Sequence, residues 1–201
     1  SGLKVKEYLK LAETYLPRWD KDMAQRLTEL FHLDRKQRIT KLSKGMVSML
    51  QIVVALASKA DFTFLDEPVS GLDVVAREAF YRLLLEEFTE TERTFVISTH
   101  IIEEAADIFE EVIFLHEGKI LLKENTQDLL EHSVYVSGKT EAVDRLIQGK
   151  QIYCPEVLGR SKSALVRLRE GERLSGGEGV TLQGVNLQKI FVALCGGEER
   201  V

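Results

Sequence analysis

The stretch Asp61-Phe-Thr-Phe-Leu-Asp-Glu-Pro-Val-Ser-Gly-Leu-Asp73 decides the fold of this 201-residue chain. Its residues 62–65 are apolar or β-branched, as in a short strand that is buried on both faces of a parallel sheet. Two carboxylates, Asp66 and Glu67, follow at the carboxyl end of the strand, where open α/β sheets place their ligand crevice. We therefore expect an α/β fold with its functional site at this edge of the sheet.

The two neighbouring carboxylates are expected to have different tasks. Side chains of adjacent strand residues point to opposite faces, so Asp66 and Glu67 share a task only if the backbone turns between them. A division of labour fits better, with one carboxylate holding Mg²⁺ and the other orienting or deprotonating an attacking water. An isolated Asp-Glu pair more often simply ends a strand, so this interpretation depends on the rest of the sequence.

Two other motifs support the catalytic interpretation. Leu42-Ser43-Lys44-Gly45-Met46 lies upstream, and Thr99-His100 follows a second apolar run at residues 94–98. In this order and spacing, the three motifs resemble the nucleotide-binding subunit of ATP-binding cassette (ABC) transporters over about residues 1–130. The resemblance implies a partial P-loop NTPase fold with a parallel core sheet, a helical subdomain and a small α+β carboxyl-terminal appendage.

The same resemblance implies roles for individual residues. Residues 62–66 look like the Walker B strand, with Asp66 as the metal ligand, and Glu67 and His100 look like the catalytic glutamate and the switch histidine. Residues 42–46 look like the signature loop and residues 70–73 like the D-loop. The expected contacts to ATP are then made by Ser43, Lys44, Gly45 and Asp73. Lys44 and Met46 depart from the commonest signature, Leu-Ser-Gly-Gly-Gln, but Lys44 adds a positive charge near the phosphate.

Helices are expected on both sides of these motifs. Apolar residues recur at helical spacing from Leu3 to Leu16, and Pro17 ends that helix. Asp20 is a plausible N-cap for a second helix at residues 21–31, with a buried stripe that comprises Met23, Leu27, Leu30 and Phe31. Further helices are predicted from residue 45 or 46 to Ser58 after Ser43, at residues 74–88 after Asp73, with a core stripe of Val75, Ala79, Leu83 and Leu84, and at residues 101–109 after His100.

The remainder of the chain changes in character. Residues 111–115 and 119–122 are predicted to form a hairpin, and short β-rich pieces near residues 134–136, 151–153 and 164–166 precede a final helix at residues 187–194. We expect three parts: residues 1–57, the helical subdomain with the signature; residues 58–130, half of the catalytic core; and residues 131–201, the appendage.

Composition excludes several classes of protein. The formal net charge of −5 argues against nucleic acid as the main partner, because phosphate binding requires clustered Lys and Arg. No apolar run is long enough to cross a bilayer. Cys154 and Cys195 lack partners at metal-ligand spacing, and we expect both to be reduced.

One expected motif is missing before the signature, namely the Gly-rich phosphate loop of the Walker A half. Residues 133–140 end like such a loop, but their middle is β-rich and they follow the Walker B strand. Residues 174–178 imitate the signature without a following amphipathic helix. We expect both stretches to be turns, and the chain by itself to be inactive.

The resemblance leaves three functions open. The first is an ATPase subunit of bacterial exporter type that couples Mg-ATP hydrolysis in a sandwich dimer to transport by a separate permease. Its partners would be a second ABC ATPase subunit, identical or not, and the permease, on the cytoplasmic face of the membrane. The second is a soluble regulatory ABC module, and the third is a truncated cassette that only presents its signature. The substrate and direction of transport are not encoded in these motifs.

Overall fold

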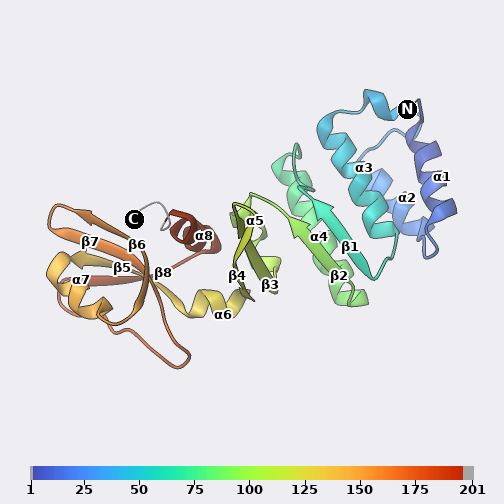
Figure 1. Cartoon of the computed structure of the whole chain (residues 1–201). Coiled ribbons are helices and arrows are strands. Elements are labelled where there is room, and N and C mark those ends of the chain that lie inside the picture. Colours follow the sequence, from blue (N-terminus) through green and yellow to red (C-terminus); the bar gives the residue numbers. More distant parts are fainter. Residues whose placement is uncertain (1, 197–201) are drawn as a thin grey trace. The chain divides into compact units, whose positions relative to one another are not determined.

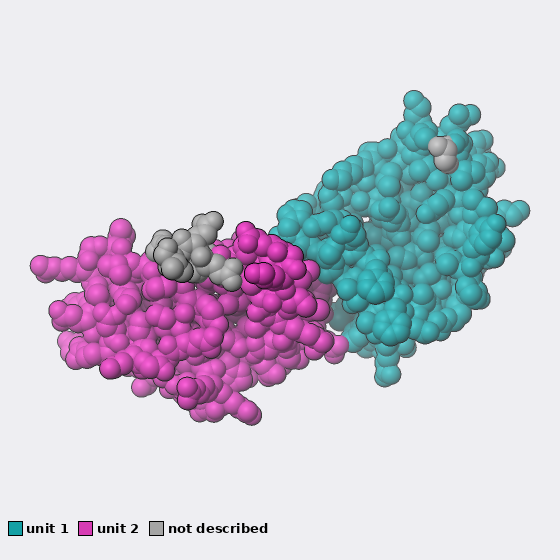
Figure 2. Space-filling model, in the orientation of Figure 1, with its two compact units in different colours: residues 1–100 teal, residues 101–201 magenta. Residues whose placement is uncertain are grey.

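A computed structural model describes residues 2–196, apart from the side chains of residues 104, 105 and 196. The chain divides into two compact units, residues 1–100 and 101–201 (Figure 2). Within residues 2–196, no helix combines the length and the apolar character that a membrane span requires. The expected three-part division of the chain stays a prediction.

Three α-helices open the first unit: α1 (Val5–Tyr15), α2 (Lys21–Leu30) and α3 (Lys44–Ala57), with the 3-10 turn η1 (Ile39–Lys41) before α3 (Figure 1). The Asp20 carboxylate caps α2 by accepting a hydrogen bond from Met23 N at 2.8 Å, as predicted. The expected stripes are only partly buried, because Leu30 and Tyr15 are 44% and 77% exposed. The buried apolar residues of α1 and α2 are Val5, Leu9, Ala24 and Leu27.

The sheet of the first unit has two parallel strands, β1 (Phe62–Asp66) and β2 (Thr94–Ser98), in the register Phe62 to Thr94 through Asp66 to Ser98. The parallel pairing confirms the prediction. The expected burial on both faces was wrong: Leu65 is buried, whereas Phe62 and Phe64 are 66% and 75% exposed. Burial therefore alternates along β1, because only one face of this sheet is packed.

Helix α4 (Val74–Thr91) joins the two strands. Asp73 caps it through Ala76 N at 2.8 Å, which confirms the predicted cap. The predicted stripe was wrong at Val75, which is 76% exposed. The buried side of α4 is formed instead by Ala76, Phe80, Leu83, Leu84 and Glu87.

A buried ionic cluster ties α4 to its neighbours. The Glu87 carboxylate is 1% exposed, and it accepts hydrogen bonds from Lys59 Nζ at 2.8 Å and Arg93 Nη1 at 2.6 Å. The Arg93 guanidinium also donates to the carbonyl oxygens of Ala55 and Leu56. Arg93 therefore adds a donor to each of two carbonyls at the end of α3, which also accept hydrogen bonds from Ser58 Oγ and Lys59 N.

The second unit begins with α5 (Ile102–Ala105), the 3-10 turn η2 (Ala106–Ile108) and an antiparallel hairpin of β3 (Glu111–His116) and β4 (Lys119–Asn125). The predicted hairpin is confirmed. The predicted continuous helix at residues 101–109 was wrong, because α5 is only four residues long and a 3-10 turn follows it. Ile101, at the N-cap of α5, offers no side-chain hydrogen bond to hold the helix start.

A four-stranded antiparallel sheet forms most of the second unit, in the order β6-β7-β5-β8. Its strands are β5 (Ser133–Lys139), β6 (Gln151–Leu158), β7 (Ser161–Arg167) and β8 (Val180–Gly184), and its helices are α6 (Thr126–Glu131), α7 (Thr140–Ile147) and α8 (Leu187–Gly196). Residues 133–139 are thus a strand, not a phosphate loop. Residues 174–177 have no helical or strand structure, so neither imitation of a nucleotide motif forms the element that its motif requires.

Candidate functional site

The end of β1 places Asp66 beside β2. Asp66 is the Cα partner of Ser98, whose hydroxyl donates a hydrogen bond to Asp66 Oδ1. The Asp66 side chain is exposed. A carboxylate at the carboxyl end of a parallel strand, free to reach a ligand, is what the sequence predicts for the metal-binding residue.

Glu67 continues from the strand in a left-handed backbone conformation, with φ of 44°. Few residues other than glycine adopt this conformation, and such strain is found mostly where the surrounding structure imposes it. Here Glu67 N donates to Ser98 O at 3.0 Å, and Ser70 N donates to Glu67 O at 3.0 Å. The backbone therefore turns between the two carboxylates, which is the condition that allows both to serve one site.

His100 lies against the Glu67 carboxylate. Its Nδ1 is 2.7 Å from Glu67 Oε1, and its backbone N–H donates to the same oxygen at 3.0 Å. The His100 side chain is 76% exposed. When Nδ1 donates to the carboxylate, Nε2 is left for another ligand.

One oxygen of Glu67 is left over. Glu67 Oε2 is buried and has no hydrogen-bond partner within residues 2–196. A buried oxygen without a partner is costly, so it marks a place where water or a ligand is expected. Asp66, Glu67, Ser98 and His100 thus converge on one edge of the sheet.

The signature residues lie at the start of α3. Ser43 Oγ accepts from Met46 N at 3.2 Å, so Ser43 is the N-cap, and α3 begins at Lys44, slightly earlier than predicted. Lys44 is exposed, and Gly45 is partly buried. The 14-residue helix presents unpaired N–H groups and the positive end of its dipole at this point, which favours an anion.

The signature and the D-loop touch within this chain, a contact that the sequence analysis missed. A Cβ on Gly45 would lie 2.4 Å from Gly71 O, and Ser48 Oγ donates to Ser70 O at 3.0 Å. Gly71 has φ of 81°, which favours glycine. The sequence shows glycine at both positions. It does not show that the two backbones approach each other closely, which is why glycine is needed there.

Asp73 belongs to the same segment, but its carboxylate is engaged. Its Oδ1 caps α4, and the carboxylate is exposed at the end of the D-loop. A direct contact of Asp73 with nucleotide stays a prediction.

The donor atoms at the sheet edge fit a magnesium ion. Mg²⁺ prefers carboxylate oxygens, usually takes only one or two from the protein and completes its shell with waters and phosphates. Within residues 2–196, no group of three or more His, Cys, Asp or Glu side chains gathers as a closed metal cage. The exposed Asp66 carboxylate fits an ion that takes few ligands from the protein.

Comparison with protein families and solved structures gives a consistent result. A family model described as "AAA domain, putative AbiEii toxin, Type IV TA system" matches residues 8–106, a range that includes Asp66, Glu67 and His100. A solved structure titled "Structure of ATP binding subunit of ABC transporter" matches with a TM-score of 0.56 and 26% identity, over 64% of this chain and 55% of that one.

Two relatives extend the match beyond the nucleotide motifs. The ABC transporter ATP-binding protein YtrB of Bacillus subtilis (strain 168) is 22% identical over 97% of this chain and 69% of its own length. The bacitracin transport ATP-binding protein BcrA of Bacillus licheniformis is 30% identical over 82% of this chain and 58% of its own length. This chain therefore spans only part of each relative. Its sequence is similar to those of ATP-binding proteins of ABC transporters, and its α/β fold is similar to that of a solved ATP-binding subunit.

Proposed function

We propose that this chain contributes the Walker B, switch and signature parts of an ATPase subunit that drives an ABC transporter. The observation that carries the proposal is the pairing of Glu67 Oε1 with His100 Nδ1 at 2.7 Å, at the carboxyl end of the parallel strands. The homology to ABC transporter ATP-binding proteins supports it.

Each residue of the site has a task in this proposal. Asp66 would hold Mg²⁺, which would neutralise phosphate charge when bound. Glu67 would accept the proton of a water that attacks the γ-phosphate, and the two hydrogen bonds from His100 keep its carboxylate in one orientation. With Nδ1 engaged, His100 Nε2 would donate to phosphate when the ring is protonated.

The signature would act on a second nucleotide. Ser43 and the N–H groups at the start of α3 form an anion site, and Lys44 adds a positive charge. The contact of Gly45 with Gly71 couples this site to the D-loop of the same chain. We infer a sandwich of two ATPase subunits that binds ATP and Mg²⁺ and attaches to a permease on the cytoplasmic face of the membrane.

The test is the rate of ATP hydrolysis by a subunit that contains this chain together with a Gly-rich phosphate loop. Glu67→Gln keeps the shape of the side chain but removes the basic oxygen, so hydrolysis should fall about 100-fold or more while ATP binding survives. Glu78→Gln, at an exposed position of α4, is the matched control and should keep the parent rate.

The rate of hydrolysis by the Glu67→Gln variant also shows whether Glu67 is the base. A Glu67→Gln subunit that hydrolyses at the parent rate would show that another group is the base. Residues 1–201 alone lack the phosphate loop, and we expect them to bind Mg-ATP weakly and to be inactive. Tight binding by the chain alone would contradict that expectation.

A further inference from the structure

The hydroxyl of Ser98 holds one oxygen of the Asp66 carboxylate. Asp66 and Ser98 are directly opposed in the parallel pair of β1 and β2, so their side chains lie on the same face of the sheet. Ser98 Oγ donates a hydrogen bond to Asp66 Oδ1. Asp66 Oδ2 accepts no hydrogen bond and joins no ion pair within residues 2–196. One carboxylate oxygen is therefore held, and the other is left for a ligand.

The chemical type of this partner matters for a metal site. A Lys or Arg beside Asp66 would neutralise the carboxylate and compete with a cation for it. A serine hydroxyl is neutral, so it orients the carboxylate and leaves its negative charge for the ion. Mg²⁺ requires a nearly ideal octahedral arrangement of oxygen ligands, and a carboxylate that is already oriented suits this requirement.

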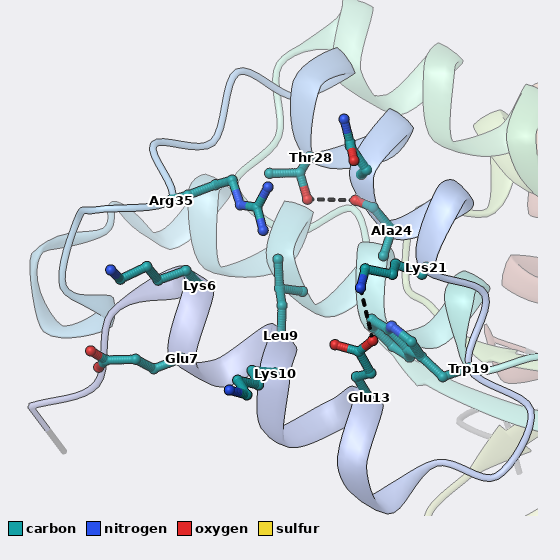
Figure 3. Close-up of a pocket in the computed structure, with 11 residues that line it drawn as sticks. Lys6, Glu7, Leu9, Lys10, Glu13, Trp19, Lys21, Ala24, Thr28 and Arg35 are labelled. Carbon is teal, nitrogen blue, oxygen red and sulfur yellow. Dashed lines mark hydrogen bonds and ion pairs between the residues drawn. The ribbon is translucent and has the colours of Figure 1, made fainter.

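Packing does not hold the Asp66 side chain, because it is exposed. The groove of about 470 Å³ in the first unit lies between α1 and α2, and residues between Lys6 and Arg35 line it (Figure 3). This groove therefore does not enclose Asp66. The orientation of the carboxylate depends on its hydrogen bond to Ser98, and a side chain without that bond would lose more rotamer freedom on binding an ion.

The backbone of Ser98 contacts the second carboxylate residue. Ser98 O accepts a hydrogen bond from Glu67 N at 3.0 Å, next to the contact of Glu67 with His100. Replacement of the Ser98 side chain removes the hydroxyl but keeps this carbonyl oxygen. The orientation of Asp66 can therefore be changed by one substitution that leaves the backbone contact of Glu67 in place.

We propose that Ser98 is a positioning residue of the metal site, whose hydroxyl fixes Asp66 Oδ1 and leaves Oδ2 for Mg²⁺. The inference rests on the metal-binding role of Asp66 in the proposed function, and it adds a residue to which that proposal gives no task. Ser98 is not a ligand in this inference. It acts through Asp66, so its loss should weaken metal binding without abolishing it.

The experiment measures the broadening of backbone amide NMR signals of this chain by Mn²⁺, which prefers octahedral oxygen ligands as Mg²⁺ does. The signals of Asp66 and Ser98 should broaden in the parent chain, and excess Mg²⁺ should restore them. Ser98→Ala should raise the Mn²⁺ concentration for half-maximal broadening about fivefold, as expected for the loss of one hydrogen bond to a carboxylate. Ser98→Thr keeps a hydroxyl and should stay within about twofold of the parent.

Two further variants serve as controls. Thr94→Ala lies at an exposed position of the same strand, opposite Phe62, and should stay within about twofold of the parent because its hydroxyl is at the other end of β2. Asp66→Asn should abolish the broadening, because it removes the charge that binds the ion. Urea denaturation checks the fold of each variant. If Ser98→Ala fails to fold, Ser98→Val takes its place, because Val has nearly the shape of Thr but no hydroxyl.

The results distinguish a failure of this inference from a failure of the proposed function. Parent-like Mn²⁺ binding by Ser98→Ala, together with loss of binding in Asp66→Asn, would overturn the role of Ser98 and keep that of Asp66. Equal losses in the Thr and Val variants, or in Thr94→Ala, would also overturn it. Broadening that survives in Asp66→Asn, or no broadening in the parent chain, would refute the metal-binding role of Asp66 and the inference with it.

Discussion

Arg93 is the residue whose loss we expect to damage the first unit most directly. It is 6% exposed, and it donates to the buried Glu87 carboxylate, to Thr63 and to two carbonyls at the end of α3. Arg93→Ala leaves these acceptors buried with fewer donors, although Lys59 still pairs with Glu87. We expect a loss of roughly 2–4 kcal/mol in the free energy of unfolding, measured by urea denaturation.

Arg82→Ala is the matched control for that measurement. Arg82 and Glu86 form an exposed pair with an N–O distance of 4.0 Å. Exposed pairs contribute little because water and salt screen them, so the control should lose less than about 0.5 kcal/mol. Similar losses for the two variants would mean that the buried cluster contributes no more than a surface pair.

Asp61 provides a pH-dependent prediction at the residue scale. The hydrogen bond from the Arg18 guanidinium, at 2.7 Å, lowers the pKa of the Asp61 carboxyl below its ordinary value of 3.8. The folded state therefore holds the Asp61 proton less tightly than the unfolded state. The contribution to stability is present above pH 3.8 and is lost as the pH falls through the lowered pKa.

Carboxyl NMR titration checks this prediction. Arg18→Gln should raise the pKa of Asp61 towards the ordinary value, and the variant should lose less stability than the parent chain as the pH falls below 4. Arg26→Gln, at another exposed position, should leave the Asp61 titration unchanged. An unchanged pKa in Arg18→Gln would rule out the guanidinium as the cause.

At the scale of elements, the two faces of β1 differ strongly in exposure. Phe64 is 75% exposed and its neighbour Leu65 is 8% exposed. We expect Phe64→Thr to change the free energy of unfolding by less than about 0.5 kcal/mol, because no packing is lost and Thr favours strands. Leu65→Ala should cost about 2–4 kcal/mol through the cavity that it leaves.

Chemical denaturation of the two variants side by side measures the difference. A large loss in Phe64→Thr would show that the face is covered when the protein is in solution. The pair is well matched, since both residues lie in the middle of the same strand.

At the scale of the whole molecule, each unit has contacts that stabilise it separately. The second unit contains two apolar clusters, one around Phe114, Leu129 and Ile190 and one around Val136, Val143 and Val166. All of these residues come from its own elements. We expect residues 101–201, expressed alone, to unfold in one cooperative thermal transition.

Circular dichroism and calorimetry of this segment provide the measurement. Val136→Asp, at a side chain with no exposed surface, should abolish the transition, because it buries a charge in the second cluster. A segment without a cooperative transition would show that the second unit depends on residues 1–100 for its fold.

The sequence by itself determined the features that depend on neighbouring residues. The caps at Asp20, Ser43 and Asp73 and the β3–β4 hairpin follow from local hydrogen bonding and periodicity. The order of the acidic, signature and histidine motifs also pointed to the ABC family, because these motifs are short and contiguous.

Only the tertiary structure decided which distant residues meet. The contact of Glu67 with His100 joins residues 33 positions apart, and the approach of Gly45 to Gly71 joins residues 26 positions apart. The left-handed turn at Glu67 is held by a hydrogen bond to Ser98 O on the next strand. The burial of Glu87 and the exposure of Phe64 likewise depend on what packs against each element. Periodicity indicates which side of a helix or strand is apolar. The residues that pack against that side lie far away in the sequence, so periodicity does not identify them.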